Sequence, residues 1–404
     1  MNRLGKNSVI VISILTLLYV LPLLYEVAFK PLPDAVLISY STYKDEFLIN
    51  KKDGPKSEYY TAGGQQISKE TYYEWLPVFY YKKLEKDGSL PDSINNEPLT
   101  IGNLKRHNYF FRLTDGIVNE AQPVFVPIFE ATDEATHFNI NNDFFSFKHQ
   151  IEFIDIYTGE KDEEKSQKFT EALETSGFVF PAKKIYGDIR PQKNFDSGYY
   201  IIDAHNHLFT LRMVLGKPVV EIIPIPNNLS VCYIFCTDPL NMEILSVIIS
   251  KQNEIYLHLG TTNIIVKTDI TNYNPEKDEI LIFGNQFNKT FLFQNDREIR
   301  LNVINDNYKT FRSYQYNRQP KKFKLFDTFK NILFPVRIKI DFKKNQIVKP
   351  TIEITDNYFF FLINLLPAIF YFLYRRKNKP FIETGIIFLT GIPGLISFLM
   401  IRNE

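Results

Sequence analysis

Apolar positions gather at the two ends of the chain, and the middle alternates short apolar runs with turn residues. Residues 9–25 carry no charge and follow the basic side chains of Arg3 and Lys6. A helix of this length measures about 25 Å, close to the hydrocarbon thickness of a bilayer. The residues that follow, 26–30, offer no signal-peptide cleavage site. The pattern therefore favours a membrane anchor within residues 1–29 over a cleaved signal peptide.

Two further uncharged segments close the chain, residues 358–374 and 385–401. A basic elbow between them contains Arg375, Arg376, Lys377 and Lys379. Segments of this length and composition predict a transmembrane helical hairpin over residues 357–404. The sequence thus predicts three transmembrane helices in all.

The distribution of basic residues predicts how these helices cross the membrane. Short loops rich in Lys and Arg stay on the cytoplasmic side. The N-terminus and the elbow are both basic, so we expect both in the cytoplasm. Two crossings between the basic segments satisfy this requirement: the first helix leaves the cytoplasm and the second returns to it. They place residues 30–356 outside the cytoplasm, and a third crossing places Glu404 there as well.

The C-terminal apolar segments contain small and amide side chains, namely Asn364, Thr390, Gly391 and Gly394. In lipid no hydrophobic force drives helices together, so small residues and buried amides are what allow close packing. We expect these four residues to pack helices, either within this chain or against the membrane helices of a partner. No Asp, Glu, Lys, Arg or His lies deep in the three segments, so an ion or proton path within the chain is not expected.

Residues 30–197 predict a mixed β/α part. Short apolar runs separated by turn residues are typical of strands. Ser68 is placed to cap a short helix. A second helix is predicted over residues 162–176, because acidic residues fill its first turn and Gly177 follows its end.

Residues 198–356 predict repeated β-hairpins. Two stretches can be aligned by matching Asn206 to Asn253, each a turn residue between alternating strands. A third copy covers residues 280–304 and a fourth residues 336–354. The copies recur roughly every forty residues, as propeller blades do, although two packed sheets would satisfy the same pattern. The predicted fold is therefore a mainly β outer domain of hairpin repeats, propeller-like or sandwich-like, with short helices and three transmembrane helices.

Charge and cysteine usage narrow the classes of function. The 404 residues include 47 basic and 46 acidic side chains, a net charge of +1, so nucleic acid is not an expected partner. Cys232 and Cys236 lie four residues apart in a strand-like run, roughly 13 Å, too far for a disulfide. The basic residues Lys321, Lys322 and Lys324 are read as part of a solvated loop rather than as lipid contacts.

The one tempting set of chemical groups is Asp203, His205 and His207. Two imidazoles two residues apart on a strand point the same way, which is typical of the start of a metal site in amidohydrolase-type enzymes. Such sites recruit more ligands from later barrel strands, but only His258 follows, among hairpins. We therefore read Asp203 and Asn206 as turn residues. We expect no catalytic residue, metal or cofactor, and keep the first three residues as a candidate binding group.

Several segments resemble a bacterial membrane-protein family catalogued as domain of unknown function 4857. They are LPVFYYKKL, PIFEATDEATHFNINNDFFSF, KSQKFTEALETSGFVFPAKKIYG, GYYIIDAHNHLFTLRMVLGKP and TGIPGLISFLM. Members of this family look like companions of ABC-type transporters in Gram-negative bacteria. The resemblance implies an inner-membrane protein that faces the periplasm beside a permease and an ATPase.

These observations support three hypotheses of function. The first is a membrane-anchored periplasmic accessory or binding subunit, without catalytic activity, associated with an ABC-type transporter. The second is a membrane-tethered, metal-dependent hydrolase that uses Asp203, His205 and His207. The third is a free-standing envelope scaffold. None of them defines a cargo or a small-molecule ligand.

Overall fold

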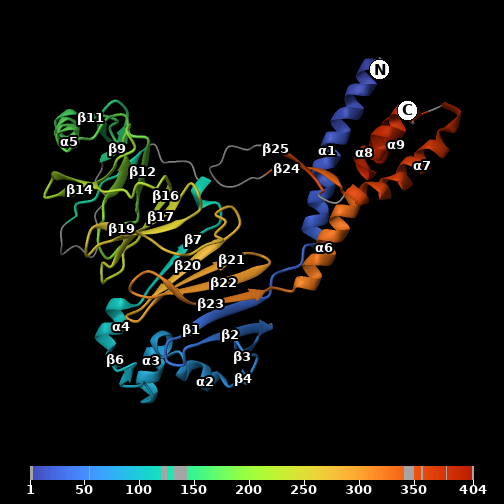
Figure 1. Ribbon diagram of the computed structural model, residues 1–404. Helices are drawn as coiled ribbons and strands as arrows, with labels where there is room; N and C mark the ends of the chain where they lie inside the picture. The colour runs from blue at the N-terminus through green and yellow to red at the C-terminus, as the bar shows by residue number, and fades with distance from the viewer. Residues whose placement is uncertain are drawn as a thin grey trace. The chain divides into compact units, whose positions relative to one another are not determined.

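The computed structural model describes residues 3–53, 55–119, 125–131, 143–340, 350–355, 358–378 and 380–402. The chain forms two compact units. Unit 1 joins the two ends of the chain, Met1–Asp34 and Asn317–Glu404, and unit 2 is the stretch between them, Ala35–Tyr316 (Figure 1). Each unit is described by itself below.

The described part of unit 2 contains five main antiparallel sheets. Sheet I consists of β1 (Ala35–Ser41), β2 (Glu46–Asp53), β3 (Lys56–Thr61) and β4 (Gln66–Ile67). Sheet II consists of β8 (Val126–Pro127), β9 (Asp143–Phe147), β10 (Ile151–Asp155) and β11 (Lys161–Asp162). Sheet III consists of β12 (Lys184–Gly187), β13 (Tyr199–Ile202), β14 (Leu208–Val214) and β15 (Lys217–Ile223).

The remaining two main sheets continue the series. Sheet IV consists of β16 (Val231–Cys236), β17 (Ile244–Ser250), β18 (Ile255–Leu259) and β19 (Ile264–Lys267). Sheet V consists of β20 (Glu279–Gly284), β21 (Lys289–Gln294), β22 (Glu298–Ile304), β23 (Thr310–Asn317) and, beside β20, the earlier strand β7 (Tyr109–Leu113). A small hairpin is formed by β5 (Ser93–Ile94) and β6 (Glu97–Pro98).

The hairpin repeats predicted from the sequence are confirmed in sheets III and IV. Asn206 and Asn253 occupy the same place, the turn between the second and third strands of each sheet. Both have a left-handed backbone, with φ of 68° and 62°. Asn tolerates this conformation better than most residues. The matching turn residues therefore reflect the same local geometry in two successive sheets.

Buried side chains hold the sheets face to face in a stack. One hydrophobic cluster joins sheets II and III, a second joins III and IV, a third joins IV and V, and a fourth joins V and I. No cluster of described residues joins sheet I to sheet II. Each sheet resembles a propeller blade, but the structure forms an open stack. The residues that the structure describes form neither a closed propeller nor a sandwich of two sheets.

Side chains alternate across sheet I, so both of its faces are covered. Phe47 and Ile49 point toward sheet V. Leu48, between them, packs with Tyr72 and Leu76 from the helical segment that follows the sheet. This alternation is what the period of two along a strand requires. Helices thus cover the face of sheet I that no sheet covers.

The helices of unit 2 are short and capped. They are α2 (Lys69–Glu74), α3 (Pro77–Asp87), α4 (Ile101–His107), the 3-10 turn η1 (Ile117–Asn119) and α5 (Glu163–Thr175). Ser68 Oγ accepts the N–H of Thr71 at 3.0 Å. Asp162 Oδ1 accepts the N–H of Lys165 at 2.9 Å. The cap at Ser68 is the one that the sequence predicts, whereas Asp162, expected within the first turn of its helix, is the N-cap of α5.

The expected division between residues 30–197 and 198–356 falls inside one sheet. Strand β12 lies before this division and pairs with β13, which lies after it. The fourth hairpin copy, residues 336–354, was expected to continue the repeats. It instead belongs to unit 1, where, among the described residues, β24 (Val336–Ile340) forms a two-stranded sheet with β25 (Pro350–Ile354).

Unit 1 is built around α1 (Arg3–Phe29). Residues Gly5–Phe29 of this helix have a mean hydropathy of 2.4, and within the described chain only this helix is both long and apolar enough to cross a membrane. Around it lie α6 (Pro320–Leu333), η2 (Tyr358–Asn364), α7 (Leu365–Tyr374), η3 (Arg376–Asn378), α8 (Phe381–Thr390) and α9 (Ile392–Arg402). Arg3 and Lys6 lie in the first turns of α1, and Arg375, Arg376 and Lys377 lie in the elbow after α7; Lys379 is outside the described residues.

The prediction of three long transmembrane helices is wrong. The segment 358–374 begins as a 3-10 turn, which leaves ten residues in α7. The segment 385–401 breaks at Gly391, which has φ 66° and ψ −136°. An L-residue adopts this backbone only with strain, so no helix continues through it. Helices α8 and α9 contain 10 and 11 residues, and each rises about 15 Å, half the thickness of the hydrocarbon core.

Side-chain contacts fix how the short helices run. Asn364, before α7, lies against Gly391, and Tyr371 lies 5.8 Å from Phe398 between ring centroids, so α7 and α9 run in parallel. Helix α8, which lies between α7 and α9 in the sequence, runs antiparallel to both. The chain therefore turns back at Gly391, and Figure 1 shows its C-terminus at the same end of unit 1 as the N-terminus and the elbow. Among the described residues the last apolar segment does not form the long helix that the expected third crossing requires, and Glu404 itself lies outside those residues.

Candidate functional site

The predicted binding group Asp203, His205 and His207 forms the turn between β13 and β14. Asp203 is completely buried, whereas both histidines are exposed. The hairpin turn expected from the sequence at Asp203 and Asn206 is confirmed, and the two histidines lie in it with their rings nearly perpendicular, at 88°. The structure thus brings the three residues together, but as parts of a loop and not as neighbours along a strand.

Both oxygens of the Asp203 carboxylate accept hydrogen bonds from the protein. Oδ1 accepts the main-chain N–H groups of His205 and His207 at 2.8 and 2.7 Å. Oδ2 accepts the N–H of Val179 at 3.4 Å and lies 3.2 Å from His207 Nδ1. Short polar side chains that bind the main chain in this way organise turns. This network accounts for the burial of the carboxylate without a metal ion.

The spacing of these three side chains can be compared with a metal site. One ligand atom from each lies within 4.8 Å of the others. This upper limit includes the separation of about 3.4 Å that tetrahedral zinc, with bonds near 2.1 Å, needs between ligand atoms, so the number of ligands and their hydrogen bonds decide the comparison. A fourth protein ligand is missing from the group among the described residues. The arrangement therefore fits a polar turn better than a preformed zinc site.

A cavity of about 620 Å³ lies between sheets III and IV. Its walls come from β13 to β15, from β17 and β18, and from three loops, residues 194–197, 240–242 and 260–263. A volume of this size is typical of sites for small molecules. Its polar lining includes Asp196, Tyr200, Thr210, Arg212, Glu221, His258, Thr261 and Asn263.

His258 forms the buried end of the polar wall and is 1% exposed. The hydroxyl of Tyr200 lies 2.7 Å from Nδ1, and the side-chain oxygen of Asn263 lies 2.8 Å from Nε2. An amide oxygen can only accept, so Nε2 carries the proton and Nδ1 accepts from Tyr200. Burial lowers the pKa of His258, and the bond to Asn263 opposes this only in part. The imidazole is therefore neutral and fully hydrogen-bonded.

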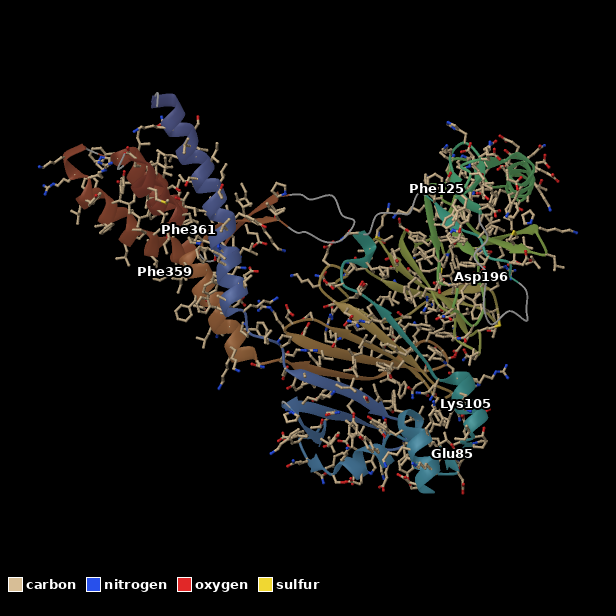
Figure 2. The ribbon with its side chains drawn as sticks, turned by 180° about the vertical axis from the view of Figure 1, so that it is seen from behind. Glu85, Lys105, Phe125, Asp196, Phe359 and Phe361 are labelled. Atoms are coloured by element: carbon tan, nitrogen blue, oxygen red, sulfur yellow. The ribbon has the colours of Figure 1, made fainter. Side chains whose placement is uncertain are left out.

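Two ion pairs involve residues that line the cavity. Arg212 and Glu221, on the neighbouring strands β14 and β15, approach to 3.1 Å and remain partly exposed. Asp196, labelled in Figure 2, pairs with Lys193 at 2.6 Å, and both of these side chains are buried. Lys193 also lies over the ring of Phe129 at 4.1 Å. The wall is thus polar without a large excess of either charge.

A second cavity, of about 460 Å³, lies among β7, β12 and β16 and reaches Cys236. Burial raises the pKa of the Cys236 thiol, so this thiol stays protonated and is a poor nucleophile. Cys232 and Cys236 are both free, as expected. We therefore regard the cavity between sheets III and IV as the better candidate site.

The four residues predicted to pack helices meet at the turn between α8 and α9. Asn364 donates from Nδ2 to the carbonyl oxygen of Phe388 at 3.0 Å, which satisfies an acceptor at the end of α8. A Cβ on Gly391 would lie 2.7 Å from Asn364 Oδ1, and one on Gly394 would collide with Thr390 Oγ1. The small side chains allow this close approach within the chain itself.

Sequence reasoning missed most of the cavity. No motif in the sequence marks Tyr200, Arg212, Glu221 or Asn263. His258 entered the sequence analysis only as the one histidine that follows His207, too few for a metal site. Arg212 and Glu221 sit diagonally on adjacent strands, which a strand alignment could have suggested. The meeting of Tyr200 with His258 depends on two sheets that pack face to face, and no local pattern encodes that.

Fold and site together define an antiparallel β protein with a ligand-sized cavity, joined to an apolar helical unit. A family model described as a domain of unknown function, DUF4857, matches residues 37–304, and the chain belongs to this family. The match lies within unit 2. A search of curated proteins finds no match.

Replacement of Asp203 tests the turn interpretation. In Asp203→Ala the main-chain N–H groups of His205, His207 and Val179 lose their acceptor. We expect the free energy of unfolding to fall by about 2 kcal/mol. The exposed control His205→Ala should change it by less than about 0.5 kcal/mol. Both can be measured by thermal unfolding of the full chain in detergent. A stoichiometric metal in the purified protein that is lost in His205→Ala would contradict this interpretation.

The neutral state of His258 predicts a loss of stability in acid. Its folded-state pKa is lowered, so below the ordinary value of about 6.5 the unfolded chain binds the extra proton. The free energy of unfolding should therefore decrease as the pH falls from 7.5 to 5.5. In His258→Gln this decrease should be smaller, with lower stability at pH 7.5, whereas His205→Gln should keep the wild-type decrease. Equal decreases in all three proteins would show that His258 does not contribute.

Proposed function

We propose that this protein is a membrane-anchored accessory subunit whose β domain binds a partner or small ligand and does not catalyse a reaction. The surface of unit 1 carries this proposal. One side of α1, with Ile10, Ile14 and Leu18, is buried against the other helices. Its other side leaves large apolar residues such as Ile12 and Leu24 exposed. Exposed apolar surface of this extent is costly in water and favourable in lipid.

The short helices extend the same apolar surface. Exposed residues of α7 and α8 are Leu365, Leu366, Ile369, Phe370, Leu373, Tyr374, Phe381, Ile382 and Leu389. If the exposed faces of α1 and α7 contact lipid, the turn at Gly391 is still surrounded by protein, because it is buried. Irregular backbone at membrane depth is tolerated where protein surrounds it. We therefore assign α1 as the spanning helix and α8–α9 as a re-entrant hairpin.

The basic residues support one orientation. Arg3 and Lys6 open α1, and the elbow with Arg376 and Lys377 lies at the same end of unit 1 (Figure 1). Under the positive-inside rule this end is cytoplasmic. The chain connects to unit 2 at Asp34 and Asn317, at the other end of unit 1, which supports a location of the β domain outside the cytoplasm. In the Gram-negative cell that the family resemblance implies, this compartment is the periplasm.

The absence of catalysis is supported by how the candidate groups are engaged. Asp203 accepts four hydrogen bonds, and both nitrogens of His258 are occupied. The cavity instead offers partly exposed Arg212 and Glu221 beside hydroxyl and amide groups. Such a wall suits recognition of a small polar ligand by hydrogen bonds. The partners implied by the family resemblance are an ABC-type permease and its ATPase.

Cysteine labelling tests the orientation. Tyr157→Cys in unit 2, Lys377→Cys in the elbow and Arg402→Cys at the end of α9 would each be introduced into Cys232→Ala/Cys236→Ala protein. In intact spheroplasts, an impermeant maleimide should label only the first. The other two should react only after permeabilisation. Labelling of position 377 with protection of 157 would reverse the orientation, and labelling of 402 would show that the last segment crosses.

Mild detergent extraction from the native host tests the partnership. A tag at the N-terminus should recover a permease and an ATPase in fixed ratio with this chain. A tagged, unrelated inner-membrane protein handled in parallel should not recover them. If neither subunit is recovered while a reference transporter stays intact, the scaffold hypothesis replaces the accessory one.

A further inference from the structure

Helix α6 has an inner face that holds it to the end of α1. Phe323 and Phe326 are buried, and the ring of Phe326 stacks on that of Tyr25 at 5.3 Å. Lys330, one turn further along, forms an ion pair with Glu26 of α1. These contacts fix α6 beside the last turns of α1. The sequence had placed the start of this segment in a solvated loop, which the helix overturns.

The opposite face of α6 is also apolar, but nothing in the described chain covers it. Leu325 and Phe329 are four residues apart, so they lie on the same side of the helix. They are 59% and 55% exposed. A helix on a water-soluble protein normally buries one apolar stripe and turns polar residues outward. Helix α6 has two such stripes and therefore has a second apolar environment to satisfy.

Three lysines flank the exposed stripe at the start of α6. Lys321, Lys322 and Lys324 are all exposed. None of them forms an ion pair with a carboxylate in the part of the chain that the structure describes. The outer face of α6 thus combines two large apolar side chains with a compact group of positive charges.

The surface of α6 continues that of its neighbours in unit 1. Val27 and Phe29 of α1 are strongly exposed. So is Phe359 of η2, which lies beside α6 and is labelled in Figure 2. The exposed stripe of α6 therefore extends the surface that we assign to lipid.

Contacts along α1 place α6 at the edge of the hydrocarbon core. The part of α1 from Lys6 to Glu26 rises by about 30 Å, which is the thickness of that core. Gln319, just before α6, donates from Nε2 to the carbonyl oxygen of Leu32 at 3.3 Å. Helix α6 therefore starts beyond the end of α1 and runs back toward the core. Its lysines lie farther out than Phe329.

We propose that α6 is an interfacial helix that inserts Leu325 and Phe329 into the outer leaflet and binds anionic phospholipid headgroups through Lys321, Lys322 and Lys324. This inference rests on the proposed membrane anchorage. Amphipathic helices of this composition lie at the boundary between headgroups and acyl chains. Lysines near an anionic surface add electrostatic attraction to the apolar contact. The lipid surface thereby holds the segment that links the β domain to the last helices.

The experiment uses the full chain, with Cys232→Ala and Cys236→Ala, in vesicles of phosphatidylcholine with or without one quarter phosphatidylglycerol. An environment-sensitive fluorophore is attached at Leu325→Cys or Phe329→Cys. Quenchers attached to the lipid chains should quench both probes, and the emission should shift further to the blue with phosphatidylglycerol. Lys321→Gln/Lys322→Gln/Lys324→Gln should abolish this additional shift. The matched control Lys82→Gln/Lys83→Gln/Lys86→Gln, which removes three exposed lysines of α3, should retain it.

Two further probes separate this proposal from membrane anchorage itself. A probe at Leu15→Cys in α1 should be quenched by lipid-attached quenchers, and one at Ile222→Cys in the β domain should be quenched only by iodide. If Leu15→Cys is lipid-quenched but positions 325 and 329 behave like 222, the proposal for α6 is wrong while the anchor stands. If Leu15→Cys also fails, the anchorage is wrong. An equal shift in both lipid mixtures would exclude the headgroup contact.

Discussion

The turn at Gly391 determines the organisation of unit 1. A helix that ends in an apolar environment leaves carbonyl groups that water cannot reach. Asn364 donates to one of them, at Phe388, and the N–H of Gly391 itself donates to Ile387. The absence of a side chain on Gly391 makes room for the amide. This small polar contact lets the last apolar segment fold back. The end of α9 therefore lies at the same end of unit 1 as the elbow (Figure 1).

The β domain solves a different problem, which is how to bury sheets that are apolar on both faces. Strands such as β13 and β18 are buried at every position, so each needs a neighbour on either side. Stacking gives each inner sheet a neighbouring sheet on both of its faces. At sheet I the last face is covered by helices rather than by another sheet. An open stack needs such a cover, whereas a closed ring does not.

The candidate cavity follows from this stacking. Sheets III and IV share an apolar core that includes Ile202 of sheet III and Ile248 of sheet IV. Between the same sheets Tyr200 reaches His258, and Arg212 and Glu221 lie on the cavity wall. Buried polar groups in such a place must be satisfied by one another, because an unpaired group costs free energy. The His258 network meets this condition and supports the cavity wall, while Arg212 and Glu221 on the same wall stay partly exposed.

The sequence alone determined much of the local structure. The caps at Ser68 and Asp162, the paired turns at Asn206 and Asn253, and the apolar helix α1 all depend on residues close together in the chain, where propensity and period act directly. Tertiary structure decided the rest. The stacking of five sheets, the cavity, and the fold-back at Gly391 arise from contacts between distant residues. Hydropathy counts apolar residues along a segment but does not register a glycine whose backbone can turn the chain. The length of an apolar run could therefore not reveal that the last one turns back.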